Sequence, residues 1–361
     1  MKRHWKILGM GGLASIIGIL SLGALTIPSQ SIDSPHQSSE VHSLKPLPNQ
    51  LLKPSSEQLG ASLSQSIIGS ATEPVTGLTI ADSRRFSSLR LKFKQQKWQE
   101  LELGDRIQSI AEQFLGEPYQ ANLLEKSSME QPFISLHQFD CVLFLETVLA
   151  LTTVLSKNSD YPDALSSIQP SSTLSISQSE SELFTAIERY RYRDGKIDGY
   201  CSRLHYFSDW ILDNQRRGNV EPIAQDSGST SLTKSLNFMS NNWQKYLPLV
   251  KNPVLRDCIS QSEINITNQL KTGALRYIPT HKLRSQEPKL RSGDLVGIVT
   301  NMNGLDVTHS GFLYRKDSRS RPGLIHASLR SGIKISADLE RYVIGVEGAI
   351  GIVVSRPVLL H

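Results

Sequence analysis

The stretch FDCVLFLETVLAL, residues 139–151, describes one long buried helix with a cysteine at its beginning. Asp140 directly precedes an apolar run, a position typical of the residue that caps a helix N-terminus. Cys141 is then the first helical residue. The turns that follow are apolar almost all round, which predicts a helix over about 140–155 that lies inside the protein core.

The predicted place of Cys141 suggests chemistry. The first turn of a helix leaves N–H groups unpaired and brings the positive end of the helix dipole close to the sulfur. Both effects favour the thiolate, so we expect the pKa of this thiol to lie below its ordinary value of ~8.5. The alternative is a structural cysteine, because buried thiols are common in protein cores.

Two histidines on short β-type runs are the candidate partners of this thiol. His309 lies in VTHSGFLY, which begins at residue 307, and His326 lies in LIHASL, which begins at residue 324. An antiparallel hairpin connected over residues 316–321 would bring the two imidazoles opposite one another, where one could hold the tautomer of the other. His309 shares its face with Gly311, which we expect to leave room for a substrate backbone. Each histidine could also be an ordinary core or surface residue.

The remaining pattern divides the chain into a helical half and a β half. Helices are predicted over 107–115, ended by Gly116, and over 201–217. Helices followed by an antiparallel sheet predict the α+β class. Ser-rich stretches at 156–181 and 226–233 are expected to be surface loops. The predicted strands, each bounded by turn residues, are 294–300, 307–314, 324–329, 332–336 and 351–356.

The first residues have the pattern of an export signal. MKRHWK is followed by an uncharged apolar stretch over 7–27 and then by Pro28 and small polar residues. We interpret residues 1–31 as a signal peptide or, since the apolar stretch is long enough to cross a bilayer, as a membrane anchor. Residues 32–84, rich in Ser, Pro and Gln, are expected to be a linker, and 85–361 the catalytic domain. The expected location is the periplasm or the cell wall.

Composition limits the classes of partner. The formal net charge is +5, and three of the positive charges, Lys2, Arg3 and Lys6, belong to the export signal. The rest of the chain has no basic stripe with interleaved aromatic residues, so we expect no nucleic-acid partner. Membrane contact is expected only through the N-terminal segment, and the sequence leaves the oligomeric state open.

Three cysteines leave at least one thiol unpaired. Cys141, Cys201 and Cys258 are too few, and odd in number, for a disulfide framework, and Cys201 is interpreted as a packed thiol. A zinc site made of Cys141 and the two histidines is an alternative, but no CxxC or HExxH spacing accompanies it. The chain contains no GxSxG motif, so a serine hydrolase is not indicated. We expect neither a metal ion nor a cofactor.

Six ordered motifs resemble those of one known family. Over roughly residues 100–357 the chain is similar to the N-acetylmuramoyl-L-alanine amidase-like proteins, within the NlpC-like, papain-like cell-wall cysteine hydrolases. The motifs are GEPY at 116–119, FDCVLFLETVLAL at 139–151, RYRDGKIDGYCSRLHYFSDWILDN at 191–214, GDLVGI at 293–298, GLDVTHSGFLY at 304–314 and LIHASL at 324–329.

The resemblance implies a role for several residues. Cys141 would be the nucleophile, His309 the general base and His326 the residue that orients the base. Backbone N–H groups near the start of the helix would stabilise the oxyanion. Tyr119 looks like the tyrosine that the family has near its nucleophile. Three further residues lie in a motif expected to line the substrate groove, unless they belong to a helix whose polar side chains face solvent: Arg203, His205 and Tyr206.

The implied fold is papain-like or NlpC-like, with a nucleophile at a helix N-terminus that packs on an antiparallel sheet. The implied function is hydrolysis of peptidoglycan or muropeptides at the N-acetylmuramoyl–L-alanine amide. Cleavage between D-glutamate and the diamino acid of the stem peptide, or binding of peptidoglycan without cleavage, are the alternatives. Two positions depart from the family pattern, Leu143 and Ser310, and neither is expected to touch the thiol or the base.

Overall fold

The computed structural model describes residues 78–359, except 128, 158–177, 224–227 and 318. The predicted export segment over 1–31, and the predicted linker as far as residue 77, lie outside these residues. So do most of the Ser-rich stretch at 156–181 and part of the one at 226–233. Within the described ranges, no helix is long and apolar enough to cross a bilayer.

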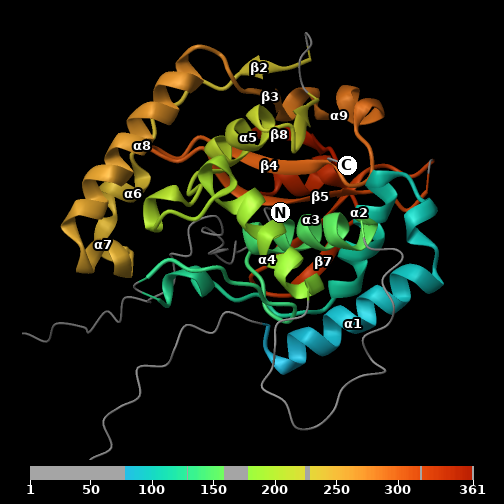
Figure 1. The fold of residues 1–361 in the computed structure, drawn as a ribbon. Coiled ribbons are helices and arrows are strands. Elements are labelled where there is room, and N and C mark those ends of the chain that lie inside the picture. Colours follow the sequence, from blue (N-terminus) through green and yellow to red (C-terminus); the bar gives the residue numbers. More distant parts are fainter. Residues whose placement is uncertain (1–77, 128, 158–177, 224–227, 318, 360–361) are drawn as a thin grey trace, which may run out of the picture. The chain divides into compact units, whose positions relative to one another are not determined.

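One antiparallel sheet organises the described residues (Figure 1). Its strand order is β2-β3-β8-β4-β5-β6-β7, and β1 also pairs with β8. All five predicted runs are strands of this sheet, and the predicted α+β class is confirmed. The strands are β1 (Val220–Pro222), β2 (Thr230–Ser231), β3 (Arg276–Pro279), β4 (Leu295–Thr300), β5 (Val307–Tyr314), β6 (Gly323–Ser328), β7 (Gly332–Ser336) and β8 (Ala349–Pro357).

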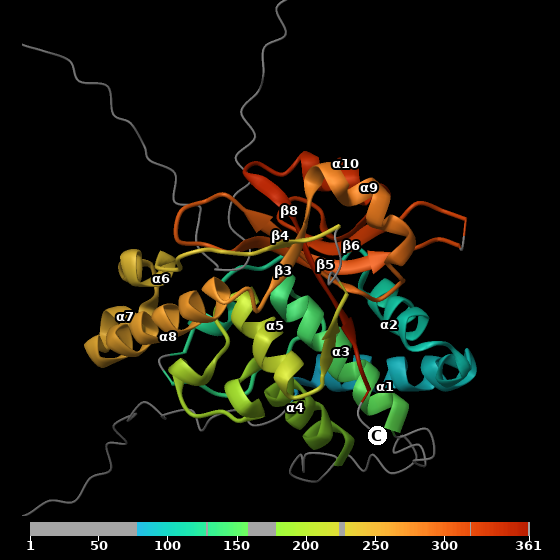
Figure 2. The ribbon, with the colours of Figure 1, turned by 90° about the horizontal axis from the view of Figure 1, so that it is seen from above.

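Helices cover both faces of the sheet, as Figure 2 shows with α3 and α4 on one side and α9 and α10 on the other. Successive side chains of β5 point to opposite faces of the sheet. Phe312 packs edge-on against Phe144 of α3, and Leu313 belongs to the apolar cluster under α10. The helices are α1 (Ile80–Gln95), α2 (Leu103–Ala111), α3 (Cys141–Lys157), α4 (Gln178–Arg191), α5 (Phe207–Arg216), α6 (Phe238–Asn241), α7 (Leu247–Lys251), α8 (Pro253–Lys271), α9 (Leu283–Gln286) and α10 (Leu339–Ile344).

Helix α3 has the cap and the burial that its sequence predicts. The Asp140 carboxylate accepts hydrogen bonds from the backbone N–H groups of Val142, at 3.0 Å, and Leu143, at 2.8 Å. Every side chain from Leu143 to Leu155 is buried. The α3 N-terminus is therefore a fixed point in the core, next to the sheet.

The helix predicted from Cys201 begins six residues later, at Phe207. Residues 200–202 form a single 3₁₀ turn after Gly199, whose φ of 67° ends any helical path. The next residue, Arg203, is extended and forms an antiparallel bridge with Tyr192. The helical spacing of this segment is overridden by pairing with the end of α4.

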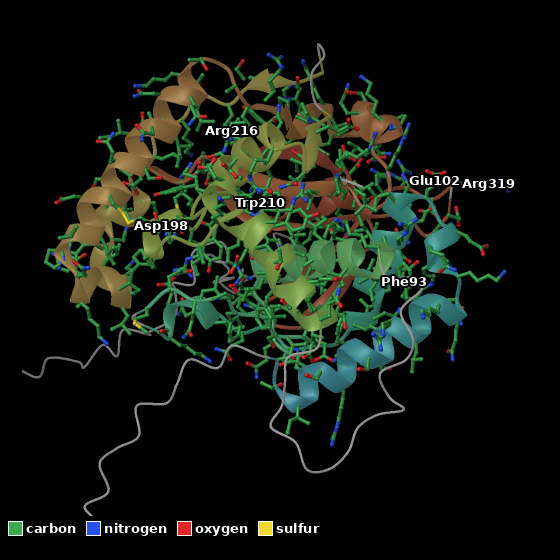
Figure 3. The ribbon with its side chains drawn as sticks, in the orientation of Figure 1. Phe93, Glu102, Asp198, Trp210, Arg216 and Arg319 are labelled. Atoms are coloured by element: carbon green, nitrogen blue, oxygen red, sulfur yellow. A yellow bond between two sulfur atoms is a disulfide. The ribbon has the colours of Figure 1, made fainter. Side chains whose placement is uncertain are left out.

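Cys201 and Cys258 form a disulfide between this segment and α8, drawn as a yellow bond near Asp198 in Figure 3. The interpretation of Cys201 as a packed thiol was therefore wrong. Cys141 is the free cysteine, and its side chain is buried. The bridge closes a loop across 57 positions of sequence and ties residues 200–202 to the long helix α8.

Two segment boundaries also differ from the sequence interpretation. Helix α1 begins at Ile80, ahead of the expected domain start near residue 85, because the Thr79 side chain accepts from the N–H of Asp82. Asp82 in turn accepts from the N–H of Leu136, at 2.7 Å. Parts of the two Ser-rich stretches that were expected to be loops are regular structure. Residues 178–181 begin α4, and residues 230–231 form β2.

Candidate active site

Cys141 lies where the N-terminus of α3 meets β5, and its side chain has no exposed surface. The backbone N–H and the hydroxyl of Ser310 lie against its sulfur, where both lower the pKa of the thiol. The expectation that Ser310 does not touch the thiol was wrong. Because Ser310 directly follows His309 on β5, the contact brings the thiol to the strand that carries the histidine.

Burial raises the pKa of Cys141 well above the usual thiol value, and the charge of Asp140 adds to the rise. The two contacts from Ser310, and the N–H of Cys141 itself, act in the opposite direction. Removing a thiolate from water outweighs these donors and the helix dipole. The predicted lowering of this pKa was wrong, and the resting group is a neutral thiol.

The two histidines meet as predicted, but in a different register. Nε2 of His309 lies 2.8 Å from Nδ1 of His326, and both side chains are buried. The paired part of β5 and β6 ends at Phe312 opposite Ile325, so the histidines lie beyond it. A Cβ atom at Gly311 would come within 2.9 Å of the His326 Cβ. Gly311 therefore makes room for His326 rather than for substrate.

His326 has two further neighbours that sequence reasoning missed. Its Nε2 lies 3.0 Å from the hydroxyl of Ser336 on β7, and the Tyr342 hydroxyl of α10 lies 3.4 Å from its Nδ1. The rings of His326 and Tyr342 have centroids 4.6 Å apart. Alternation along GIKIS (332–336) could have indicated Ser336 as a neighbour of His326. Lys334 is opposite His326 in the sheet, and Ser336 lies on the same face as Lys334. We refer to His309, His326, Ser336 and Tyr342 as the imidazole cluster.

Burial keeps both imidazoles neutral. It lowers the pKa of His309 to about 4. It lowers the pKa of His326 to about 2, with help from His309 and Lys334. One tautomer set satisfies every contact: His326 donates from Nε2 to Ser336 and accepts at Nδ1 from Nε2–H of His309. The lone pair of His309 is then on Nδ1, as a proton acceptor.

Tyr119 lies beside the segment that leads to Cys141. It forms a parallel bridge with Phe139, and the N–H of Gln120 donates to the Phe139 carbonyl at 2.9 Å. The same segment fixes Asp140, whose pKa is raised by burial to about 6. Asp140 already uses the N–H groups of Val142 and Leu143. These two N–H groups are therefore committed to the helix cap.

Arg203 and His205 line a small cavity together with Asp140 and Val142, the two neighbours of Cys141. Arg203 is buried and paired with Glu125, at 2.6 Å. Nε2 of His205 lies 2.9 Å from the carbonyl oxygen of Tyr200. These two predicted residues are thus close to the α3 N-terminus, although they belong to an extended segment and not to a helix.

Tyr206 is not part of that cavity. Its buried hydroxyl donates to Glu263 of α8, at 2.6 Å, and accepts from the N–H of Met239 at the start of α6. Cys141, Tyr119, Arg203 and His205 therefore lie around the α3 N-terminus, and His309 and His326 contact one another on neighbouring strands. Tyr206 lies in the contact between α5, α6 and α8.

An ion pair between Glu146 and Arg191 lies under the cavity and was also missed. Its Nε–Oε2 distance is 2.7 Å, and both side chains are at most 2% exposed. The indole N–H of Trp210, labelled in Figure 3, donates to the other oxygen of Glu146 at 3.3 Å. A glutamate inside an otherwise apolar helix is the signal that could have indicated a buried partner. We refer to Glu125, Glu146, Arg191 and Arg203 as the arginine cluster.

The arrangement suits nucleophilic chemistry at a carbonyl. It combines a thiol at a helix N-terminus with an imidazole whose tautomer is held by a second imidazole. Across the part of the chain that the structure describes, no three His, Cys, Asp or Glu side chains are grouped as ligands of one metal ion.

Comparisons with known proteins found one matching family and several similar solved structures. A family model described as N-acetylmuramoyl-L-alanine amidase-like matches residues 109–349. A solved N-acetylmuramoyl-L-alanine amidase from Bacteroides uniformis is 30% identical, aligned over 71% of this chain and 99% of its own, with a TM-score of 0.59. A solved Bacteroides fragilis protein described as a proposed xylanase is 30% identical over 69% of this chain and 99% of its own, with a TM-score of 0.56. No curated protein matches the chain significantly.

Proposed function

Because this chain belongs to the N-acetylmuramoyl-L-alanine amidase-like family of peptidoglycan hydrolases, we propose that Cys141 is the nucleophile that cleaves the amide between the muramyl lactyl group and L-alanine. One observation carries this proposal. The thiol at the α3 N-terminus lies against Ser310 of β5, and His309, the residue before Ser310 in the sequence, is held by His326. A papain-like, NlpC-like mechanism needs these three functional groups in one place.

The reaction starts from neutral groups. His309 takes the thiol proton on Nδ1 while the sulfur bonds to the lactyl carbonyl carbon, so that no isolated buried thiolate forms first. The C–N bond then breaks, and His309 returns the proton to the amine of L-alanine. Water, deprotonated by His309, hydrolyses the thioester and releases the lactyl carboxylate and the thiol. His326 stabilises the imidazolium by accepting from Nε2–H of His309.

The N–H of Cys141 is the donor that we assign to the oxyanion. The next two N–H groups are held by Asp140 and keep the helix start rigid. A positioned N–H of this kind contributes about 3–4 kcal/mol to stabilisation of a tetrahedral intermediate.

Export to the periplasm or the cell wall is part of the proposal. The apolar segment over 7–27 supports it, either as a cleaved signal peptide or as an anchor, followed by a linker to the catalytic domain. The disulfide between Cys201 and Cys258 also supports it, because such bonds persist in oxidising compartments.

Mass spectrometry of muropeptides incubated with the protein, beside a Cys141→Ala variant, tests the function. We expect free muramyl sugar and an intact stem peptide from the wild type, and neither from the variant. Cleavage after D-glutamate would replace the proposed bond by the endopeptidase alternative. Retention of uncut muropeptide by both proteins would indicate a binding module.

A further inference from the structure

A cavity of about 70 Å³ lies beside the α3 N-terminus. Asp140 and Val142, which flank Cys141 in the sequence, both line it. Another side is lined by Arg203, Leu204 and His205 and by Phe207 at the start of α5. The cavity is therefore within one residue of the proposed nucleophile, and it is large enough for one small substituent of a substrate.

Arg191, which lines this cavity, has one hydrogen-bond donor without a partner among the described residues. Arg191 is 1% exposed, and it donates from Nε to Glu146 at 2.7 Å and from Nη1 to the Phe133 carbonyl at 2.8 Å. Its Nη2 has no hydrogen-bond partner among the described residues. A buried unpaired donor is destabilising, so a ligand oxygen at this position would be bound favourably.

The charge around the cavity selects against an anionic ligand. Arg191 and Arg203 line it together with three carboxylates, those of Glu125, Asp140 and Glu146. Both guanidinium groups already have a carboxylate partner at 2.6–2.7 Å. A further negative charge would meet an excess of carboxylates, whereas an uncharged carbonyl oxygen satisfies the free donor without adding charge.

The other walls offer an apolar surface and an acceptor. Because Nε2 of His205 uses its hydrogen on the Tyr200 carbonyl, Nδ1 of this ring keeps a lone pair. Burial and Arg203 lower the pKa of His205 well below 6.5, so the ring is neutral. A group that fits has a carbonyl oxygen, an N–H and a small apolar end. The apolar walls are Leu124, Val142, Leu204, Phe207 and Trp210.

We propose that this cavity binds the acetamido group of an N-acetylmuramyl residue, with Nη2 of Arg191 donating to the acetamido carbonyl. The proposal rests on the proposed function. In muramic acid the acetamido group and the lactyl ether are attached to neighbouring ring carbons. Binding of the acetamido group beside Asp140 and Val142 therefore directs the lactyl carbonyl to the thiol between them.

Calorimetry on the full-length Cys141→Ala variant separates binding from cleavage. The ligands are N-acetylmuramyl-L-alanyl-D-isoglutamine and its analogues with a hydroxyl or an amine in place of the acetamido group. We expect the hydroxyl analogue to bind at least tenfold more weakly, because Arg191 then lacks its acceptor. Equal affinity for the hydroxyl analogue, or tighter binding of the amine, would overturn the proposal whichever bond the wild type cleaves.

A second variant tests the position without disturbing Arg191. Val142 is partly exposed and lines the cavity, so Val142→Leu fills part of its volume. We expect this change to weaken binding of the acetamido ligand several-fold and to leave the hydroxyl analogue within twofold. An equal loss for both ligands would show that the acetamido group binds elsewhere.

Discussion

The imidazole cluster and the arginine cluster flank the same cysteine, yet they keep their polar groups buried in opposite ways. The histidines are neutral and hold one another by a hydrogen bond between Nε2 and Nδ1 of 2.8 Å. The arginines keep their charges and are paired with glutamates at 2.6–2.7 Å. A neutral imidazole can accept a proton during the reaction and return it, and permanently charged groups are suited to holding a ligand.

The largest difference between the clusters should appear in turnover. We expect His309→Ala to lower kcat about 10³-fold, since general base catalysis contributes about 10²–10⁴-fold. His281 is exposed, and His281→Ala is the matched control with unchanged kcat. Steady-state kinetics on a muropeptide give both values. A His309→Ala enzyme within tenfold of wild type would remove the imidazole cluster from the reaction.

The arginine cluster should matter more for stability. Glu146→Gln removes the charge that compensates Arg191, and breaking such a buried pair costs about 3–5 kcal/mol. Urea unfolding measures this loss in free energy. Glu100→Gln breaks the exposed pair with Lys97, whose side chains are 63–70% exposed, and should cost less than about 1 kcal/mol. Equal losses would mean that burial of the Glu146 pair carries no special weight.

The pH dependence of stability should come from the imidazole cluster. The pKa of His326 falls from 6.5 to about 2 on folding, so the folded protein binds fewer protons below pH 6.5. Stability is then complete above pH 6.5 and is lost as pH falls, by about 2 kcal/mol between pH 7 and pH 5 for one histidine.

A His326→Asn variant lacks this proton uptake. We expect the difference in unfolding free energy between wild type and variant to shrink by about 2 kcal/mol from pH 7 to pH 5. His281→Asn, at an exposed position, should keep a constant difference from wild type. If the difference in unfolding free energy between wild type and His326→Asn does not change with pH, the His326 imidazole is not buried in its neutral form.

The smallest effect concerns the contact between Ser310 and the sulfur of Cys141. The Ser310 hydroxyl is buried, has no hydrogen-bond partner among the described residues, and lowers the pKa of the adjacent Cys141 thiol. Ser310→Ala should raise the thiol pKa and lower kcat/KM about fivefold, as loss of a polar contact worth ~1 kcal/mol implies. The alkylation rate of Cys141 by iodoacetamide against pH reports the pKa directly.

Two further variants separate this contact from packing. Ser310→Thr keeps the hydroxyl and should restore most of the rate. Ser355 on β8 is another buried strand serine whose hydroxyl has no partner among the described residues, so Ser355→Ala should leave the alkylation profile unchanged. An unaltered profile for Ser310→Ala would mean that the hydroxyl does not act on the sulfur.

Local patterns predicted the parts of the molecule that local forces determine. Helix α3 follows from the Asp140 cap and an apolar run, and β4 to β8 follow from short runs between turn residues. The proximity of His309 and His326 could be predicted from the sequence, because two short strand patterns joined by a short connection form a hairpin.

Tertiary contacts decided what the sequence could not predict. The start of α5 at Phe207 results from pairing between Tyr192 and Arg203, which overrides a helical spacing. The Cys141 pKa depends on complete burial, which no capping signal reports. The partners of Arg191 come from positions 45 and 58 residues away, and no motif indicates them.

Trapping the covalent intermediate tests the proposed nucleophile most directly. Wild-type protein mixed with a muropeptide and quenched in acid within the first turnover would be digested and its peptides weighed. We predict a thioester on the peptide that contains Cys141, with the added mass of the muramyl acyl group and none of the stem peptide. Turnover without any adduct on Cys141, or an adduct that carries the L-alanyl-D-glutamyl part of the stem, would contradict the proposed reaction.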